Sequence, residues 1–232
     1  MPAGWETATV VAIHDETART KTLRLRLERP TSHRAGQHYV VRLTAPDGYT
    51  ASRSYSVASP PDGTNELELT VERLDDGEVS TFLHDVLEVG DELEVRGPIG
   101  GYFVWEGTAP ALLLGGGSGI VPLMAMLRLA RSTERDALVH LVVSVRTPDD
   151  LYYADELTGR DDVTVIYSRA APPAWPRPAG RLHAPDVVPY LRDDQTVYVC
   201  GSAPFTGAVG DLLVDLGVVP ERVRFERFGP SA

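Results

Sequence analysis

The rhythm of hydrophobic residues changes near the middle of the chain, and this change constrains the fold most strongly. The first half alternates apolar and polar residues, as in the stretch from Lys21 to Leu27, whose leucines all lie on one face. A period of two predicts strands with one buried face, in an antiparallel sheet that closes as a small barrel. The other expected strands are Glu6–Ile13, His38–Thr44, Glu66–Arg73 and Glu92–Val95, and a short helix is expected at Ser80–Val86.

The second half contains continuous apolar runs separated by stretches of helical period. The runs are Ala109–Leu114, Leu138–Val145, Val163–Tyr167 and Thr196–Cys200, and a short last strand is expected at Val223–Phe228. Helices are expected between them at Val121–Arg131, Asp149–Leu157 and Thr206–Leu216. Apolar strands that alternate with helices predict an α/β parallel sheet covered on both faces. The sequence therefore predicts two domains, an antiparallel β-barrel over residues 1–106 and an α/β domain over residues 107–232.

Composition places the chain among ordinary globular proteins, since 43% of its 232 residues are hydrophobic and 24% are charged. No apolar stretch approaches the roughly 18 residues of a membrane span. The N-terminus has no basic segment before an apolar core, so we expect no secretory signal and a cytoplasmic location. The single cysteine, Cys200, excludes a four-cysteine iron–sulfur cluster within these residues, and no metal site is predicted.

Charge is unevenly distributed along the chain. The formal net charge of -11 argues against general nucleic-acid binding. Residues 1–58 nevertheless hold eight basic and five acidic side chains, a local excess of +3 that leaves −14 for the remainder. A basic first quarter can steer an acidic partner to that face. The alternative is that these arginines point outward on strands and are simply solvated.

A glycine-rich turn follows the first apolar run of the second half and opens a helix. It reads Gly115-Gly116-Gly117-Ser118-Gly119-Ile120-Val121-Pro122. Without side chains a phosphate can approach the backbone closely, and the amides at the helix start face its charge. The lysine of a nucleoside-triphosphate loop is missing, and proline suits the first turn of a helix. The turn predicts a dinucleotide phosphate site.

The second apolar run ends in an arginine. A dinucleotide fold that binds a bare ribose has an Asp or Glu at the end of its second strand, about 20 residues beyond the glycine turn. Here the run ends in Ser144-Val145-Arg146. An arginine suits a 2′-phosphate better than a bare ribose hydroxyl. The alternative is a surface arginine at a strand end.

Six motifs in chain order together resemble the ferredoxin–NADP reductase family, specifically its short, stand-alone bacterial members. The tetrad Arg53-Ser54-Tyr55-Ser56 is similar to the family's Arg-x-Tyr-Ser flavin motif. The others are Gly77-Glu78-Val79-Ser80-Thr81, Gly97-Pro98-Ile99-Gly100, the turn Gly115–Pro122, Cys200-Gly201-Ser202-Ala203-Pro204 and Glu226-Arg227-Phe228. The resemblance covers nearly the whole chain.

The resemblance implies FAD and NADP(H) as cofactors, with NAD(H) as an alternative to NADP(H). The FAD residues it implies are Arg53, Ser54, Tyr55, Ser56, Val57, Val71, Gly77, Val79, Ser80, Thr81 and Phe228. The NADP residues are Gly116, Gly117, Gly119, Pro122, Arg146, Ser168, Arg169, Arg181, Cys200 and Gly201. The catalytic residues are Ser56, Cys200 and Glu226.

Side-chain chemistry supports several of these roles. The guanidinium fork of Arg53 suits a pyrophosphate, and Tyr55 offers a flat face to a planar ring. The alternative for the tetrad is plain alternation on a surface strand. We expect Cys200 to border the nicotinamide as a positioning group rather than as a nucleophile. The chain continues past Phe228 through Gly229–Ala232, so the side chain that shields the flavin stays open.

Coenzyme preference depends on Tyr167-Ser168-Arg169, which follows the third apolar run. A Ser-Arg pair at this place resembles the 2′-phosphate clamp of NADPH-using members, and Arg146 and Arg181 can complete it. The sequence therefore favours NADPH, although Gly-Arg pairs such as Gly180-Arg181 also occur in NADH-using relatives.

The resemblance implies an FAD-dependent oxidoreductase that passes electrons from NAD(P)H to a separate acceptor protein. A small acidic ferredoxin or flavodoxin would match the basic first quarter. Three alternatives stay open: a reductase that releases free reduced flavin, an electron-transfer subunit of a larger oxidoreductase complex, and a flavin-binding sensor without catalysis.

Overall fold

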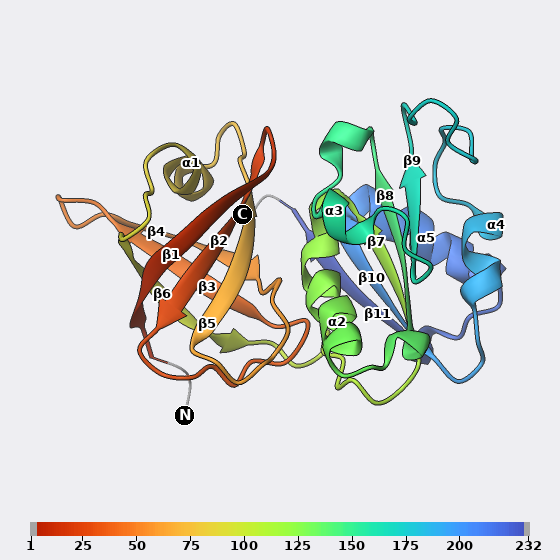
Figure 1. Cartoon of the computed structure of the whole chain (residues 1–232), viewed down its shortest axis with the longest axis horizontal. Coiled ribbons are helices and arrows are strands. Elements are labelled where there is room, and N and C mark those ends of the chain that lie inside the picture. The colour runs from red at the N-terminus through yellow and green to blue at the C-terminus, as the bar shows by residue number, and fades with distance from the viewer. Residues whose placement is uncertain (1–3, 230–232) are drawn as a thin grey trace. The chain divides into compact units, whose positions relative to one another are not determined.

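The computed structural model describes residues 4–229 and divides into two compact units, one ending at Trp105 and the other beginning at Glu106. The first unit is an antiparallel sheet of six strands in the order β4-β3-β6-β1-β2-β5 (Figure 1). The strands are β1 Glu6–Thr17, β2 Thr20–Leu27, β3 His38–Thr44, β4 Thr50–Ser56, β5 Glu66–Glu72 and β6 Glu92–Ile99. Helix α1, Glu78–Asp85, packs against β4 and β5.

The sheet of the first unit curls until its two outer strands meet. Val57, directly after β4, bridges Leu69 of β5. The leucines of β2 and β5 face each other in the interior, because Leu23 lies opposite Leu69 in an antiparallel register and both are fully buried. The alternation seen in the sequence therefore produces the closed barrel that it predicts, with a single apolar interior.

The outward residues of the same strands form ion pairs. Arg24 contacts Glu68 at 2.9 Å and Arg26 contacts Glu66 at 2.8 Å, each across the β2–β5 pair. Two further pairs are Arg19–Asp75 at 2.8 Å and Arg42–Glu94 at 2.6 Å. Carboxylates from residues 66–94 thus neutralise half of the basic groups in the first quarter.

This pairing corrects the expectation of a basic face. Residues 1–105 carry ten basic and seventeen acidic side chains, which gives the first unit a net charge of −7. The local excess in residues 1–58 is cancelled once the chain folds back on itself. Steering of an acidic partner by this region consequently loses its electrostatic basis.

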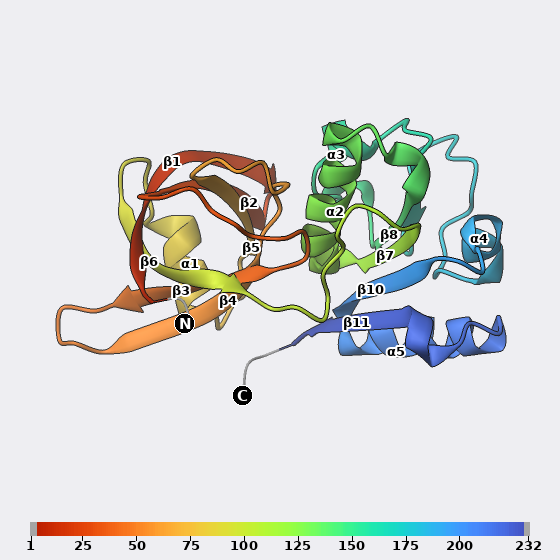
Figure 2. The same ribbon diagram turned by 90° about the horizontal axis from the view of Figure 1, so that it is seen from below.

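The second unit is a parallel sheet in the order β11-β10-β7-β8-β9. Its strands are β7 Ala111–Gly116, β8 Val139–Val145, β9 Val163–Tyr167, β10 Thr196–Ser202 and β11 Val223–Phe228. Its helices are α2 Ile120–Ser132, α3 Ala154–Leu157, α4 Ala184–Val187 and α5 Ala203–Asp215. Helices α2 and α3 lie on one face of the sheet and α5 on the other (Figure 2). Both faces are covered, as the continuous apolar runs predict.

Short 3-10 turns complete the second unit, at Gly117–Gly119, Asp136–Leu138, Pro148–Asp150, Val188–Tyr190 and Pro220–Arg222. The helix expected over Asp149–Leu157 is wrong in extent. One 3-10 turn and the four-residue α3 replace it, and Tyr153 between them has a φ of 55°. A left-handed residue interrupts the i to i−4 bonding that one continuous helix requires. Within residues 4–229, no helix combines the length and the apolar character needed to cross a membrane.

Candidate cofactor-binding sites

The tetrad that resembles a flavin motif lies on β4 of the barrel. Arg53 is exposed, and its only described hydrogen bond runs from Nη1 to the Ser52 carbonyl at 2.7 Å. Tyr55 is half-buried against the barrel interior, and burial raises its pKa, although Arg53 acts in the opposite direction. Ser54 is exposed and Ser56 is buried. Within the described residues no carboxylate pairs with Arg53, so its guanidinium is free to bind an anion.

The start of helix α1 forms the second part of the expected flavin site. The Thr81 amide makes the first helical bond, to Gly77, at 2.8 Å, which leaves the amides of the residues between them without helical partners. The Ser80 hydroxyl is already engaged, because it accepts from the Leu74 amide and donates to the Gly77 carbonyl, both at 3.1 Å. An anion here would therefore meet backbone amides and the Thr81 hydroxyl rather than the Ser80 hydroxyl.

Glycine at position 77 has a packing reason of its own. A Cβ there would lie 2.3 Å from Ser80 Oγ. The side chains of Val57, Val71 and Val79 are fully buried in the barrel interior. These three residues can contact a ligand only through their backbone, which limits the role that the resemblance implies for them.

Three glycines of the second unit are required by close packing. A Cβ at Gly119 would lie 2.2 Å from the Cys200 carbonyl oxygen. A Cβ at Gly116 would lie 2.5 Å from the Phe205 ring, and one at Gly201 would lie 2.8 Å from the same ring. Gly116, Gly119 and Gly201 thus let the β7–α2 turn and the β10–α5 turn press together at the carboxyl edge of the sheet.

Gly117 differs from these three. It has a φ of 54°, and a Cβ at this position would meet nothing within 4 Å. It precedes α2, whose first turn contains the buried Pro122 and no acidic residue. Gly117 is therefore the point of the turn at which a phosphate can approach amides and a helix start.

Cys200 and Glu226 lie side by side on β10 and β11, where they are register partners. Burial raises the pKa of the Cys200 thiol well above its ordinary value, and the neighbouring Glu226 carboxylate adds to this. Burial also raises the pKa of Glu226 to about 7, and its Oε2 is buried without a hydrogen-bond partner. Two residues further along the same strand pair, Phe228 is the register partner of Ser202 at the end of β11 and is half-buried.

Backbone hydrogen bonds bring the expected 2′-phosphate residues to one edge of the sheet. The Ser168 amide donates to Val145 at 2.8 Å, and the Arg169 amide donates to the Arg146 carbonyl at 2.9 Å. The Gly180 amide donates to Tyr167 at 2.9 Å, which places Arg181 directly beyond the end of β9. All three arginines of this group are exposed, and within residues 4–229 none of them forms an ion pair.

The sequence matches two family models in chain order. Residues 7–104 match an oxidoreductase FAD-binding domain and residues 113–211 match an oxidoreductase NAD-binding domain. The ferredoxin–NAD(P)(+) reductase component of the naphthalene 1,2-dioxygenase/salicylate 5-hydroxylase systems of a Ralstonia species is 30% identical, over 99% of this chain and 71% of that protein. The chain belongs to the ferredoxin–NADP reductase-like family.

Further proteins resemble this chain in sequence or in fold. The reductase component of propane 2-monooxygenase from Rhodococcus jostii is 30% identical over 80% of this chain and 53% of its own length. The crystal structure of an Amycolatopsis cytochrome P450 reductase has a TM-score of 0.81 and 29% identity, and the match covers all of this chain and 72% of that one. The FAD/NAD-binding domain of Vibrio cholerae nitric oxide dioxygenase has a TM-score of 0.86 at 24% identity, which supports the fold. The chain spans about half the length of several curated relatives that it matches.

The residues of this reductase-like chain fit the two cofactor classes of its domain models. Arg53 and the start of α1 supply a cation and free amides for a pyrophosphate on the barrel. On the parallel sheet, Gly117 supplies space, and the unpaired arginines supply positive charge. Exposed guanidinium groups without a carboxylate partner are open to the phosphates that both cofactor classes carry.

Two residues that shape the carboxyl edge of the parallel sheet were missed by the sequence analysis. Phe205 packs on Gly116 and Gly201, and Arg177 holds the loop that carries Arg181. Phe205 gives no signal in the sequence, because one aromatic residue at a helix start is unremarkable. Arg177 lies in a proline-rich loop, where the sequence indicates stiffness but no partner.

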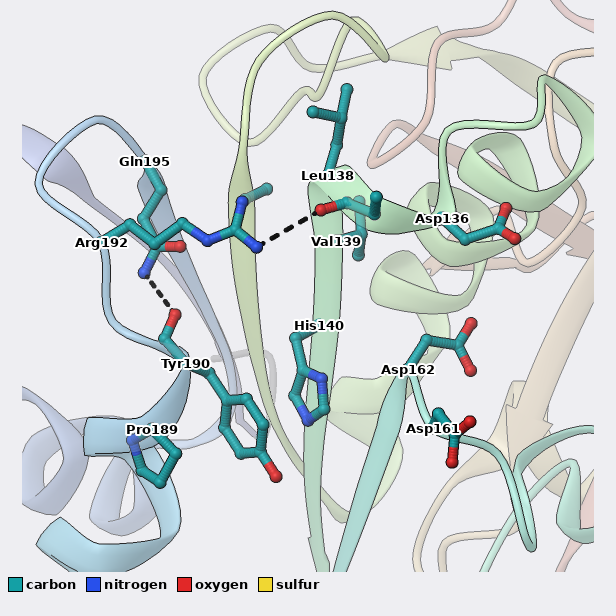
Figure 3. Close-up of a pocket in the computed structure, with 12 residues that line it drawn as sticks. Asp136, Leu138, Val139, His140, Asp161, Asp162, Pro189, Tyr190, Arg192 and Gln195 are labelled. Atoms are coloured by element: carbon teal, nitrogen blue, oxygen red, sulfur yellow. Dashed lines mark hydrogen bonds between the residues drawn. The ribbon is translucent and has the colours of Figure 1, made fainter.

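A hollow of about 320 Å³ opens at the opposite, amino edge of the same sheet (Figure 3). The rings of His140 and Tyr190 stack there at 3.5 Å, and the Thr164 hydroxyl bonds both of them at 2.9 Å. Burial lowers the pKa of His140 to about 4, so this imidazole is neutral near pH 7. The polar groups of the stack are satisfied, and the hollow lies at the other ends of the strands from the glycine turn.

Proposed function

We propose that this family member binds FAD on its barrel and NADPH at the carboxyl edge of its parallel sheet, and passes electrons from NADPH to a separate acceptor protein. The observation that carries the proposal is the open Gly117 turn beside three unpaired arginines, within a unit that matches an NAD-binding domain. FAD, when bound, supplies the chemistry of hydride acceptance and of electron release, singly or in pairs.

The proposed preference for NADPH comes from the three arginines. Arg146, Arg169 and Arg181 follow two neighbouring strands, β8 and β9, and their backbones are tied together by hydrogen bonds. A 2′-phosphate carries the charge and the acceptor oxygens that guanidinium forks bind, whereas a bare ribose hydroxyl offers neither. Ser168 adds a hydroxyl at the same edge. We therefore assign these four residues to the 2′-phosphate.

Cys200 and Glu226 are proposed to act at the nicotinamide end of the site. The raised pKa keeps Cys200 as a neutral thiol, which suits a positioning role and not nucleophilic attack. Glu226 has a pKa of about 7 and an unpartnered oxygen, so it can hold or release a proton at Oε2 near neutral pH. Ser56 is proposed to offer its hydroxyl to the reactive edge of the flavin.

The names of relatives favour one setting for the acceptor. Several are reductase components or subunits of oxygenase systems, and one is a ferredoxin–NAD(P)(+) reductase component. We propose a ferredoxin, with a flavodoxin as the alternative, as the acceptor of a reductase component of this kind. These 232 residues hold one cysteine and cannot bind a four-cysteine iron–sulfur cluster, so a cluster that accepts the electrons would lie outside them.

The test is spectroscopic. The purified chain, reconstituted with FAD, should retain a flavin absorbance at about 450 nm after gel filtration. Addition of NADPH without oxygen should bleach this band, and oxidised ferredoxin should restore it. Failure to retain flavin while free flavin is still reduced would instead support the free-flavin reductase. Retained flavin that neither NADPH nor NADH bleaches would contradict any reductase function.

A further inference from the structure

The segment Gly180–Arg181 is fixed in place by one buried ion pair in the loop that follows β9. Arg177 donates from Nε to Asp186 Oδ1 at 2.6 Å and from Nη2 to Asp186 Oδ2 at 2.8 Å. The Asp186 side chain is only 7% exposed and that of Arg177 is 21% exposed. A two-pronged contact at this burial is among the stronger ionic interactions in proteins.

The same guanidinium also binds the backbone of the segment that carries Arg181. Arg177 Nη2 donates to the Arg181 carbonyl at 2.8 Å, and Nη1 donates to the Gly180 carbonyl at 3.2 Å. From the other side, the Gly180 amide donates to the Tyr167 carbonyl at the end of β9. Three backbone groups of Gly180–Arg181 are therefore held, while the Arg181 side chain stays exposed and unpaired.

The carboxylate partner is itself held at the start of helix α4. Asp186 accepts from the His183 backbone amide at 2.9 Å and contacts the His183 ring. Burial alone would raise the pKa of Asp186, but the bonds from Arg177 and His183 outweigh it and leave the pKa below its ordinary value. Asp186 stays ionised at neutral pH, so the Arg177 fork has a permanent anchor.

We infer that Arg177 is a positioning residue for coenzyme selectivity, which sets Arg181 against the 2′-phosphate without touching the nucleotide itself. This inference rests on the proposed NADPH site. Each prong of Arg177 is used within the protein, on Asp186 and on backbone carbonyls, so none is left for a ligand. Loss of Arg177 frees the loop, and Arg181 then gives up chain entropy each time it meets the phosphate.

The test measures binding of two small nucleotides by calorimetry, independently of flavin and of activity. 2′,5′-ADP carries the 2′-phosphate and 5′-AMP lacks it. We expect Arg177→Gln to weaken 2′,5′-ADP binding by about tenfold or more, as the loss of one charge-assisted contact does. Binding of 5′-AMP should change by less than about threefold, because the glycine turn is untouched. Arg177→Lys, which keeps the charge, should recover part of the loss.

A matched control exists in the same unit. Arg131 binds Asp162 with the same two-pronged geometry, at 2.8 and 2.9 Å, but near the start of β9 instead of its end. Arg131→Gln should leave binding of both nucleotides unchanged. If Arg177→Gln yields too little folded protein, Asp186→Asn removes the same pair from its other side and should give the same selective loss.

A double variant tests whether Arg177 acts through Arg181. If it does, Arg177→Gln added to Arg181→Ala should weaken 2′,5′-ADP binding no further than Arg181→Ala alone, within about twofold. Hydrogen exchange of the Gly180 amide should speed up in Arg177→Gln and not in Arg131→Gln.

Two results overturn the inference and are distinguishable. If Arg181→Ala weakens 2′,5′-ADP binding but Arg177→Gln does not, or if the two losses add fully, Arg177 does not position Arg181. If neither Arg169→Ala nor Arg181→Ala separates 2′,5′-ADP from 5′-AMP, the proposed NADPH site fails, and the inference fails with it.

Discussion

Both edges of the parallel sheet carry arginines and other polar side chains, but the partners of these side chains differ between the edges. At the amino edge, Arg131 is paired with Asp162, His140 is bonded to Thr164 and stacked on Tyr190, and the exposed Arg192 donates, among the described residues, only to the Ala137 carbonyl, at 3.5 Å. At the carboxyl edge, the exposed arginines have no ion pair within the described chain, and Glu226 has a buried oxygen without a partner. Buried polar groups in folded proteins are normally hydrogen-bonded, so the unpartnered Glu226 oxygen is unusual, and the exposed arginines at the same edge are open to an anionic ligand.

The largest expected effect is at the glycine turn. Gly119→Ala places a Cβ about 2.2 Å from a backbone oxygen of the neighbouring turn, so the two turns must separate. We expect a loss of about 3 kcal/mol or more in unfolding free energy, and a melting temperature lower by roughly 10 °C. Gly117→Ala, with open space around it but a φ of 54°, should cost only about 1 kcal/mol. Thermal unfolding of both variants checks this, and equal stability of the two would contradict the packing argument.

Glu226 should make stability depend on pH. Its pKa rises from an ordinary 4.5 to about 7 on folding, so the folded state holds its proton more tightly than the unfolded state. Stability therefore falls as the pH rises from about 4.5 to about 7, and levels off above. Glu226→Gln should remove roughly 2 kcal/mol of this dependence between pH 5 and pH 8. Urea unfolding at both pH values measures it, and an unchanged pH slope in the variant would count against a buried, protonated Glu226.

Replacing an arginine at each edge of the parallel sheet tests which edge binds the coenzyme. Arg169→Ala should reduce kcat/KM for NADPH by about tenfold to thirtyfold, or roughly 1.5–2 kcal/mol, and change that for NADH by less than about threefold. Arg192→Ala, which removes an exposed arginine of the amino edge, is the control and should alter neither value. Equal losses for both coenzymes would show that Arg169 does not bind the 2′-phosphate.

The smallest expected effect is on the outside of the barrel. Arg26 is paired with Glu66 across two strands, and both side chains are largely exposed. Arg26→Ala should lower stability by less than about 1 kcal/mol and leave coenzyme use unchanged. Any loss of ferredoxin reduction in this variant would revive the idea of a functional basic face, which the ion pairing argues against.

The sequence predicts most of the fold because alternation and apolar runs report directly which side of a strand is buried. Lys21–Leu27 becomes the inner and outer faces of β2, and most of Leu138–Val145 becomes β8, which lies between β7 and β9 in the sheet. The break at Tyr153 was not predictable, since a left-handed tyrosine carries no signature in composition. The basic face was wrong because charge was counted along the chain, whereas Glu66 and Glu68 pair with arginines some forty positions away.

The candidate site is predicted in part for the same reason. Positions such as Gly117 and Arg169 follow apolar strands, so their place at the carboxyl edge comes from topology alone. The reasons for Gly116 and Gly119 could not be read from sequence, because they lie in contacts with Phe205 and the Cys200 backbone. Arg177 shows the same limit, since its role depends on Asp186, Gly180 and Arg181 meeting in space.

The central claim is that the arginines without ion pairs at the carboxyl edge of the parallel sheet select NADPH over NADH. Stopped-flow spectroscopy tests this claim most directly. Flavin reduction in the FAD-reconstituted protein should be measured without oxygen at equal, subsaturating concentrations of NADPH and NADH. We predict reduction that is faster with NADPH by about tenfold or more, the value of one good guanidinium–phosphate contact. Faster reduction by NADH would contradict the assignment of Arg146, Arg169 and Arg181 to the 2′-phosphate.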